Sequence, residues 1–214
     1  MPVRPAPSPP VLARACLMGI GIYVVIDVIL KFLRPGYSLL YNAESDYGRG
    51  PWFWVMDANF LLRCALSLAL VLALARQTGH DRRLKAGLVL LVVWAACSGL
   101  LAFFADNIEG QPVKGSGGVH VLLAAVAFLC VAIAAVLLSV RLRAVDGWAS
   151  ITPALLALAL AGVVAFLALG ATAGHRHLPG GLVERIFLAL ELAWIGTAAA
   201  SVIRISRRPV QTAP

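Results

Sequence analysis

Residues 119–140 read VHVLLAAVAFLCVAIAAVLLSV and contain no Asp, Glu, Lys or Arg. A helix needs about 20 such residues to cross roughly 30 Å of hydrocarbon, so this stretch predicts a transmembrane helix. Working outward from it, five further stretches meet the same requirement. The six predicted spans are residues 11–33, 52–75, 86–104, 119–140, 153–173 and 182–203.

The composition of the whole chain agrees with these spans. Of its 214 residues, 61% are hydrophobic and only 13% are charged, and the mean hydropathy is +0.89. A soluble domain has about 25% charged residues, so the composition excludes one. The sequence therefore predicts an all-α integral membrane bundle of six transmembrane helices over residues 11–205. A proline-rich, disordered cytoplasmic tail is expected at 1–10 and a second cytoplasmic tail at 206–214.

Lys and Arg are distributed unevenly between the two sides of the predicted membrane. With both termini in the cytoplasm, eleven lie on the inner side and five on the outer side. Cytoplasmic loops are enriched in these residues, so the sequence predicts that the N- and C-termini are both inside. The inner residues are Arg4, Arg14, Arg76, Arg82, Arg83, Lys85, Arg141, Arg143, Arg204, Arg207 and Arg208. The outer residues are Lys31, Arg34, Arg49, Lys114 and Arg176.

Charge and cysteine placement narrow the classes of partner. The net charge of +8 does not indicate nucleic-acid binding, because the basic residues sit between apolar runs without a readout pattern. The predicted partners are the lipid bilayer and a lipid or small polar ligand. All four cysteines lie inside spans without a CxxC pair, and no cofactor and no metal are predicted. Fifteen Arg against three Lys indicates GC-rich coding and favours the cytoplasmic membrane of a bacterium.

Ionisable residues inside the spans are the most informative part of the sequence. A charge at the centre of a transmembrane helix costs about 2.5–3.5 kcal/mol on insertion scales, so such residues should face the bundle interior and have partners. Arg63 and Glu191 both fall near the midplane, and we expect a buried ion pair that serves a site or only fixes helix register. Asp27 has Lys31 one turn later, so a local ion pair accounts for it and it is not assigned to a site.

Polar residues gather on the predicted outer side, where three helices begin and present their positive dipole ends. The longest outer loop, residues 34–51, is rich in turn-forming residues and is expected to fold back over the bundle. The residues near the three helix starts are Asp57, His120, Glu184 and Arg185. The adjoining loops add Glu44, Ser45, Asp46, Asp106, Glu109, His175 and His177.

Three kinds of chemistry fit this outer cluster. In the first, the helix starts and nearby basic side chains hold an anionic group such as a lipid phosphate, and the glycine-rich run at 115–118 offers backbone N–H groups. In the second, an outer histidine and an acidic side chain hold a zinc ion that activates water against a lipid. In the third, the acids and His120 only tie the outer loop to the bundle by hydrogen bonds.

The outer residues also carry a family resemblance. The pattern Asn42-x-x-Ser45-Asp46-x-Gly48-x-Gly50-Pro51, followed by Met56-Asp57-x-Asn59-Phe60-x-x-Arg63, resembles the six-span membrane family known as domain of unknown function 998. Further matching residues are Asp106, Gly118, His120, Gly181, Leu182, Glu184 and Arg185. The resemblance covers nearly the whole chain and implies a six-span fold with its important residues on the outer side, without an established activity. A more distant likeness is to the Frag1/DRAM/Sfk1 group of six-span proteins tied to lipid and membrane biology.

We therefore expect a non-enzymatic integral membrane protein with a polar pocket open to the outer leaflet, which binds or moves a lipid or small polar ligand. The predicted ligand-binding residues are Ser45, Asp46, Asp57, Arg63, Asp106, His120, Glu184 and Arg185. The alternatives are a membrane-embedded lipid hydrolase, with or without a metal, and a structural or assembly partner.

Overall fold

The computed structural model describes residues 6–106, 115–173, 175 and 177–207, and within these it contains helices and no strand. Six helical segments of this part are long and apolar enough to cross a membrane, as predicted. The long helices are α1 (Pro9–Leu33), α2 (Phe53–Gln77), α3 (Lys85–Leu100), α4 (Gly115–Leu142), α5 (Thr152–Thr172) and α6 (Gly180–Ser206). The short 3-10 helices are η1 (Glu44–Gly48), η2 (Arg82–Leu84) and η3 (Leu101–Phe103), of which η2 and η3 extend α3 at its two ends.

The predicted spans differ from the helices only at their ends. α4 begins at Gly115, so the run at 115–118 is its first turn and not a loop. α1 begins at Pro9, because the fixed φ of proline suits a first helical turn, and this takes residues 9 and 10 out of the predicted tail. Five residues named in the sequence predictions lie outside the described residues: Arg4, Glu109, Lys114, Arg176 and Arg208.

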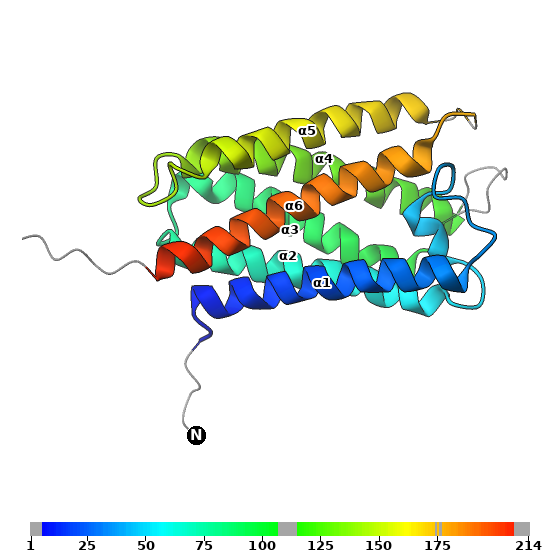
Figure 1. Ribbon diagram of the computed structural model, residues 1–214, viewed down its shortest axis with the longest axis horizontal. Helices are drawn as coiled ribbons and strands as arrows, with labels where there is room; N and C mark the ends of the chain where they lie inside the picture. Colours follow the sequence, from blue (N-terminus) through cyan, green and yellow to red (C-terminus); the bar gives the residue numbers. More distant parts are fainter. Residues whose placement is uncertain (1–5, 107–114, 174, 176, 208–214) are drawn as a thin grey trace, which may run out of the picture.

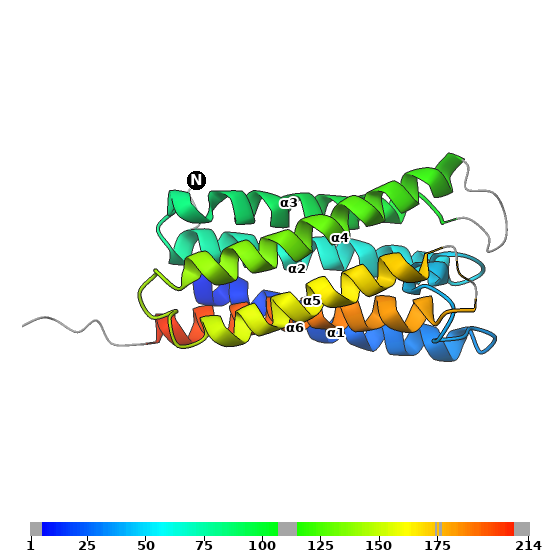
Figure 2. The ribbon, with the colours of Figure 1, turned by 90° about the horizontal axis from the view of Figure 1, so that it is seen from above.

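The six helices form a closed ring in chain order (Figures 1 and 2). Each helix packs against its neighbours in the sequence, and α6 closes the ring against α1. α6 also contacts α2 and α4 across the middle. The first residue of α1 and the last of α6 lie at one end of the bundle, here called the termini end. The connection that contains η1 lies at the opposite end, here called the η1 end.

Two tryptophan–serine pairs hold the bundle core together. The indole nitrogen of Trp94 on α3 donates to Ser67 Oγ on α2 at 3.0 Å, and that of Trp194 on α6 donates to Ser139 Oγ on α4 at 2.9 Å. Both indoles are fully buried. A buried N–H without a partner is costly, so each pair fixes the register of two neighbouring helices as well as filling volume.

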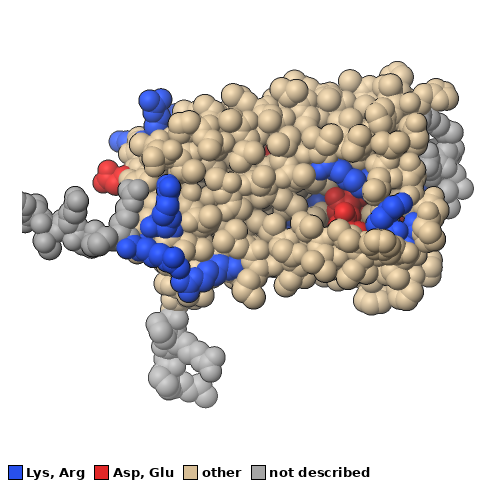
Figure 3. Space-filling model, viewed as in Figure 1, with Lys and Arg blue, Asp and Glu red and all other residues tan. Residues whose placement is uncertain are grey.

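Large apolar side chains cover the outside of the ring. Met18 and Val25 on α1, and Val164 and Leu167 on α5, are all more than half exposed. Such a surface is stable against hydrocarbon and not against water. Charged side chains are largely confined to the two ends, where basic ones gather at the termini end and acidic ones toward the η1 end (Figure 3).

Candidate functional site

The connection between α1 and α2 is a folded cap over the η1 end, as its turn-rich composition predicted. Its first part returns to α1, where Lys31 Nζ donates to Tyr37 O at 2.5 Å and Tyr37 stacks on Tyr47 with ring centroids 4.7 Å apart. Its second part is held by Asp46, which accepts from the Ala43 backbone N–H at 3.0 Å and pairs with Arg49. Asp46 therefore shapes the cap.

α6 anchors this cap to the bundle. The Leu182 backbone N–H donates to Leu40 O at 3.1 Å, and Arg185 Nη1 donates to Asn42 O at 2.7 Å. Tyr47, which lies under the Arg185 guanidinium at 5.7 Å from ring centroid to Cζ, is fully buried. Burial raises the pKa of the Tyr47 hydroxyl above its ordinary value, although the nearby Arg185 acts to lower it. The hydroxyl therefore stays protonated at neutral pH.

A cavity of about 500 Å³, here called the interior cavity, lies beneath the cap between α2, α4, α5 and α6. Five of the eight predicted ligand-binding residues line it, namely Ser45, Arg63, Asp106, His120 and Glu184. Most of its lining is apolar and includes Phe60, Leu101, Phe128, Phe166 and Leu169. The interior cavity thus combines a few polar groups with a largely apolar wall.

His120 is the best-defined polar group of the interior cavity. The residue is 3% exposed, and its Nδ1 lies 2.6 Å from Phe104 O. A carbonyl oxygen only accepts, so Nδ1 carries the hydrogen and Nε2 of the neutral ring is an acceptor. Nε2 has no hydrogen-bond partner among the described residues and lies 4.0 Å from Asp106 Oδ2, which accepts from Ser45 Oγ at 3.2 Å.

Arg63 sits in an aromatic box. Its guanidinium carbon lies 5.0 Å from the Trp94 ring centroid, 5.2 Å from that of Phe60 and 5.9 Å from that of Tyr23. Its Nη1 donates to Tyr23 Oη at 3.2 Å, and Tyr23 in turn donates to Glu44 Oε1. The positive charge of Arg63 is therefore held by ring faces and by a chain of hydrogen bonds that ends on a loop carboxylate.

The predicted ion pair between Arg63 and Glu191 is wrong. Glu191 is 1% exposed, and neither carboxylate oxygen has a hydrogen-bond partner in the part of the chain that the structure describes. It points instead at Gly162 of α5, where a Cβ would lie 2.6 Å from Oε1. Similar depth on two helices does not place side chains on facing sides, and the aromatic box holds Arg63 away from this carboxylate.

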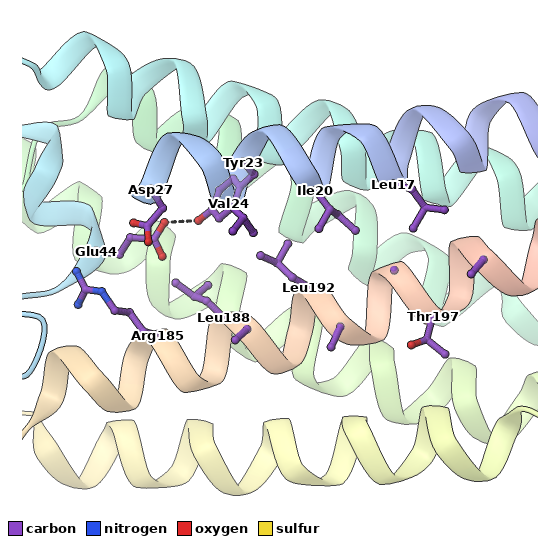
Figure 4. Close-up of a pocket in the computed structure, with 14 residues that line it drawn as sticks. Leu17, Ile20, Tyr23, Val24, Asp27, Glu44, Arg185, Leu188, Leu192 and Thr197 are labelled. Atoms are coloured by element: carbon purple, nitrogen blue, oxygen red, sulfur yellow. Dashed lines mark hydrogen bonds between the residues drawn. The ribbon is translucent and has the colours of Figure 1, made fainter. Parts of the chain in front are cut away.

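A second hollow, here called the groove, runs between α1 and α6 (Figures 3 and 4). Its volume is about 690 Å³. Asp27, Glu44 and Arg185 face one another at its end nearest the cap, and Tyr23 lies beside them (Figure 4). Most of the remaining lining is apolar or small, and it includes Leu17, Ile20, Val24, Leu188 and Leu192.

Asp27 belongs to this groove, which corrects its exclusion from the predicted site. The expected pair with Lys31 does not form, because the Lys31 ammonium group is bonded to the Tyr37 carbonyl. Asp27 Oδ1 is buried and has no hydrogen-bond partner among the residues described. Lys31 binds the Tyr37 carbonyl of the cap instead of Asp27, and an i, i+4 pattern along one helix does not reveal such a tertiary contact.

The eight predicted residues thus divide into three groups. Five line the interior cavity, and Arg185 lines the groove. Asp46 and the half-buried Asp57 line neither. Glu44, which the predicted site did not include, lines both hollows and is 4% exposed. The sequence grouped Glu44 with the polar residues of the outer loops, and this grouping was the signal that pointed to it.

The histidines of the predicted zinc chemistry do not come together. His175 and His177 are exposed, and His175 Nδ1 lies 3.1 Å from Ala173 O. Within the described ranges, no group of three or more His, Cys, Asp or Glu side chains is placed to hold a metal ion.

Six long apolar helices in a closed ring define a polytopic membrane protein. Residues 17–201 match the family described as "Protein of unknown function (DUF998)", and the chain belongs to this family. The match confirms the resemblance seen in the sequence, whereas the likeness to the Frag1/DRAM/Sfk1 group is not shown. No curated protein and no solved structure matches the chain.

Proposed function

We propose that this protein binds an amphipathic lipid whose polar headgroup occupies the interior cavity. The observation that carries the proposal is that Arg63 and His120, 2% and 3% exposed, both line this cavity with a nitrogen that lacks a hydrogen-bond partner among the described residues. A buried polar atom without a partner is costly, and a ligand that supplies the partner recovers that cost.

The walls of the interior cavity favour a lipid over a fully polar ligand. The cap side offers hydrogen-bonding groups from Ser45, Asp106 and His120, whereas the bundle side offers phenyl rings from Phe128 and Phe166. A ligand with a polar head and an apolar tail satisfies both walls, because each part meets surface of its own kind. Arg63 suits an acceptor such as a phosphate or ester oxygen, and His120 suits a hydroxyl.

The predicted topology places this cavity at the outer leaflet. Basic side chains gather at the termini end (Figure 3), which supports an inner location for that end under the positive-inside rule. With the termini inside, the cap and the interior cavity face the outer side of the membrane, which we assign to the cytoplasmic membrane of a bacterium. A lipid of the outer leaflet then reaches the cavity without crossing the bilayer.

A lipid-retention measurement tests the proposal. Protein in detergent is loaded with a phospholipid, with diacylglycerol of the same tails, or with glycerol phosphate, and retained ligand is counted by native mass spectrometry. We expect the phospholipid to be retained best. His120→Asn keeps a donor for Phe104 O and removes Nε2, so it should weaken retention about tenfold. His80→Asn, the same change at the termini end, should leave retention unchanged.

Three outcomes would overturn the proposal. Equal retention in the His120→Asn and unaltered proteins would show that the interior cavity is not the site. Tight retention of glycerol phosphate without a preference for the phospholipid would assign the cavity to a small polar ligand. Release of free headgroup or fatty acid during the incubation would replace binding by the hydrolase alternative.

A further inference from the structure

The groove combines a charged end with a long apolar floor. The residues of α6 that line it run from Arg185 to Ala200, and this length of helix covers about 22 Å. One leaflet of a bilayer core is about 15 Å thick, so an acyl chain fits along the groove. The α6 side is lined by small residues, namely Ala189, Ala193, Gly196, Thr197 and Ala200. They leave room that larger side chains would fill.

The charged end of the groove has more acidic than basic groups. Asp27 and Glu44 contribute two carboxylates and Arg185 contributes one guanidinium (Figure 4). Arg185 Nη1 donates to three backbone carbonyls, at 2.7 Å from Asn42 O, 3.1 Å from Gly181 O and 3.3 Å from Leu39 O, whereas its Nε and Nη2 are buried without a hydrogen-bond partner among the described residues. Lys31, the other basic residue of this segment, is bonded to the cap and not to Asp27.

The position of these carboxylates makes their negative charge energetically costly. The groove is a hollow of the face that α1 and α6 present to the surroundings of the bundle (Figure 3). Val24 on α1, which lines the groove, is an apolar side chain and is 48% exposed. An acidic group beside hydrocarbon is costly unless a positive group compensates it. Asp27 Oδ1, buried and without a partner among the described residues, is the atom that such a group would meet.

We propose that the groove is a second binding site, which takes an amphiphile carrying a protonated amine. The ammonium group lies between Asp27 and Glu44, and the hydrocarbon chain lies along Leu17, Ile20 and Leu192. Amine-bearing phospholipids and simple long-chain amines share this chemistry. The groove is spatially distinct from the interior cavity, because Glu44 is the only lining residue that the two hollows have in common among those described.

Photo-crosslinking tests this site. The protein is placed in nanodiscs that contain either phosphatidylethanolamine or phosphatidylglycerol with the same photoreactive acyl chain, and labelled peptides of α1 and α6 are quantified. We expect the ethanolamine lipid to label these peptides about fivefold more than the glycerol lipid. Asp27→Asn removes the charge with little change in shape and should abolish this preference. Labelling of α4 peptides around His120 should not change in this variant, which separates the groove from the interior cavity.

A second pair of variants tests the apolar part of the groove. Gly196→Leu fills the groove, because a Cβ at Gly196 already lies 3.5 Å from Ile20 Cδ1, and labelling by both lipids should fall. Gly21→Leu places the same side chain on α1 where a Cβ has no neighbour within 4 Å, and labelling should persist. Equal labelling by the two lipids, a preference that survives Asp27→Asn, or full labelling of the Gly196→Leu protein would each overturn the proposal.

Competition with a long-chain alkylamine distinguishes a simple long-chain amine from an amine-bearing phospholipid as the ligand. If it displaces the ethanolamine lipid from the groove, the ammonium group and chain are sufficient for recognition. If it does not, an amine-bearing phospholipid is the ligand. Both results support a site for a cationic headgroup.

Discussion

The interior cavity and the charged end of the groove lie at the same end of the bundle and share Glu44, yet the two hollows are built differently. The interior cavity is lined by the folded cap and by four helices, and its polar groups Arg63 and His120 are almost completely buried. The groove lies between two helices, and its apolar floor makes up most of its length. The first arrangement suits a polar head held by hydrogen bonds, and the second suits a chain held by contact with hydrocarbon surface.

One hydrogen-bonded chain connects these two hollows. Arg63 lines the interior cavity, Tyr23 lines the groove, and Glu44 lines both, with the Tyr23 hydroxyl bonded to the other two. Glu44, a carboxylate of the loop, is thus linked to Arg63 through Tyr23, whereas the sequence suggested the transmembrane Glu191 as the partner of Arg63. Because the groups are bonded in series, occupation of one hollow is expected to influence the other.

The largest effect on this pair of hollows is expected at Gly181. A Cβ at this position would overlap the backbone carbonyl of Asn42, which cannot move without the cap. Gly181→Ala should displace the cap, destabilise the protein by about 3 kcal/mol and impair ligand binding in both hollows. Unfolding titrations in detergent measure the stability. Gly180→Ala is the control, because its Cβ would meet only the Thr172 side chain, at 3.3 Å from Oγ1. Equal stability of the two variants would contradict the role of the cap.

Tyr23→Phe should break the connection between the hollows while leaving both of them in place. The variant removes a hydroxyl that bonds Arg63 and Glu44, and the loss of hydrogen bonds to charged groups should cost about 2 kcal/mol of unfolding free energy. In a double-mutant cycle with Glu44→Ala the two losses should not add, because both remove the same bond. Additive losses, measured by the same unfolding titrations, would show that the chain is not a unit.

Asp57→Asn should have the smallest effect, and it separates the structural site from the one predicted by sequence. Asp57 was assigned to the ligand site, but it is half-buried on α2 and lines neither hollow. We expect a stability change within about 0.5 kcal/mol and unchanged retention of lipid in native mass spectrometry. A loss of retention comparable to that of His120→Asn would return Asp57 to the site and require a different ligand position.

Spacing and composition anticipated some parts of the site and not others. The turn-rich segment 34–51 was expected to fold over the bundle, and its contacts with α6 agree with this. Of the eight residues predicted to form a ligand site, five line the interior cavity, and their role in binding a ligand stays a prediction. Local spacing was less informative for charge pairs. It paired Asp27 with Lys31, which the Tyr37 carbonyl takes instead, and it paired Arg63 with Glu191 by depth alone.

The six helices can be predicted from the sequence alone, because an apolar run needs only a certain length to cross the hydrocarbon of a membrane. The sequence also showed where charges lie inside spans, and such charges are costly wherever the span packs. Which of these charges meet depends on how the helices and the cap pack together. Helix rotation and the path of the cap bring Tyr23, Glu44 and Arg63 together across 40 residues of chain, and they leave Glu191 facing Gly162. Those placements depend on the packing of all six helices at once, which no single stretch of sequence contains.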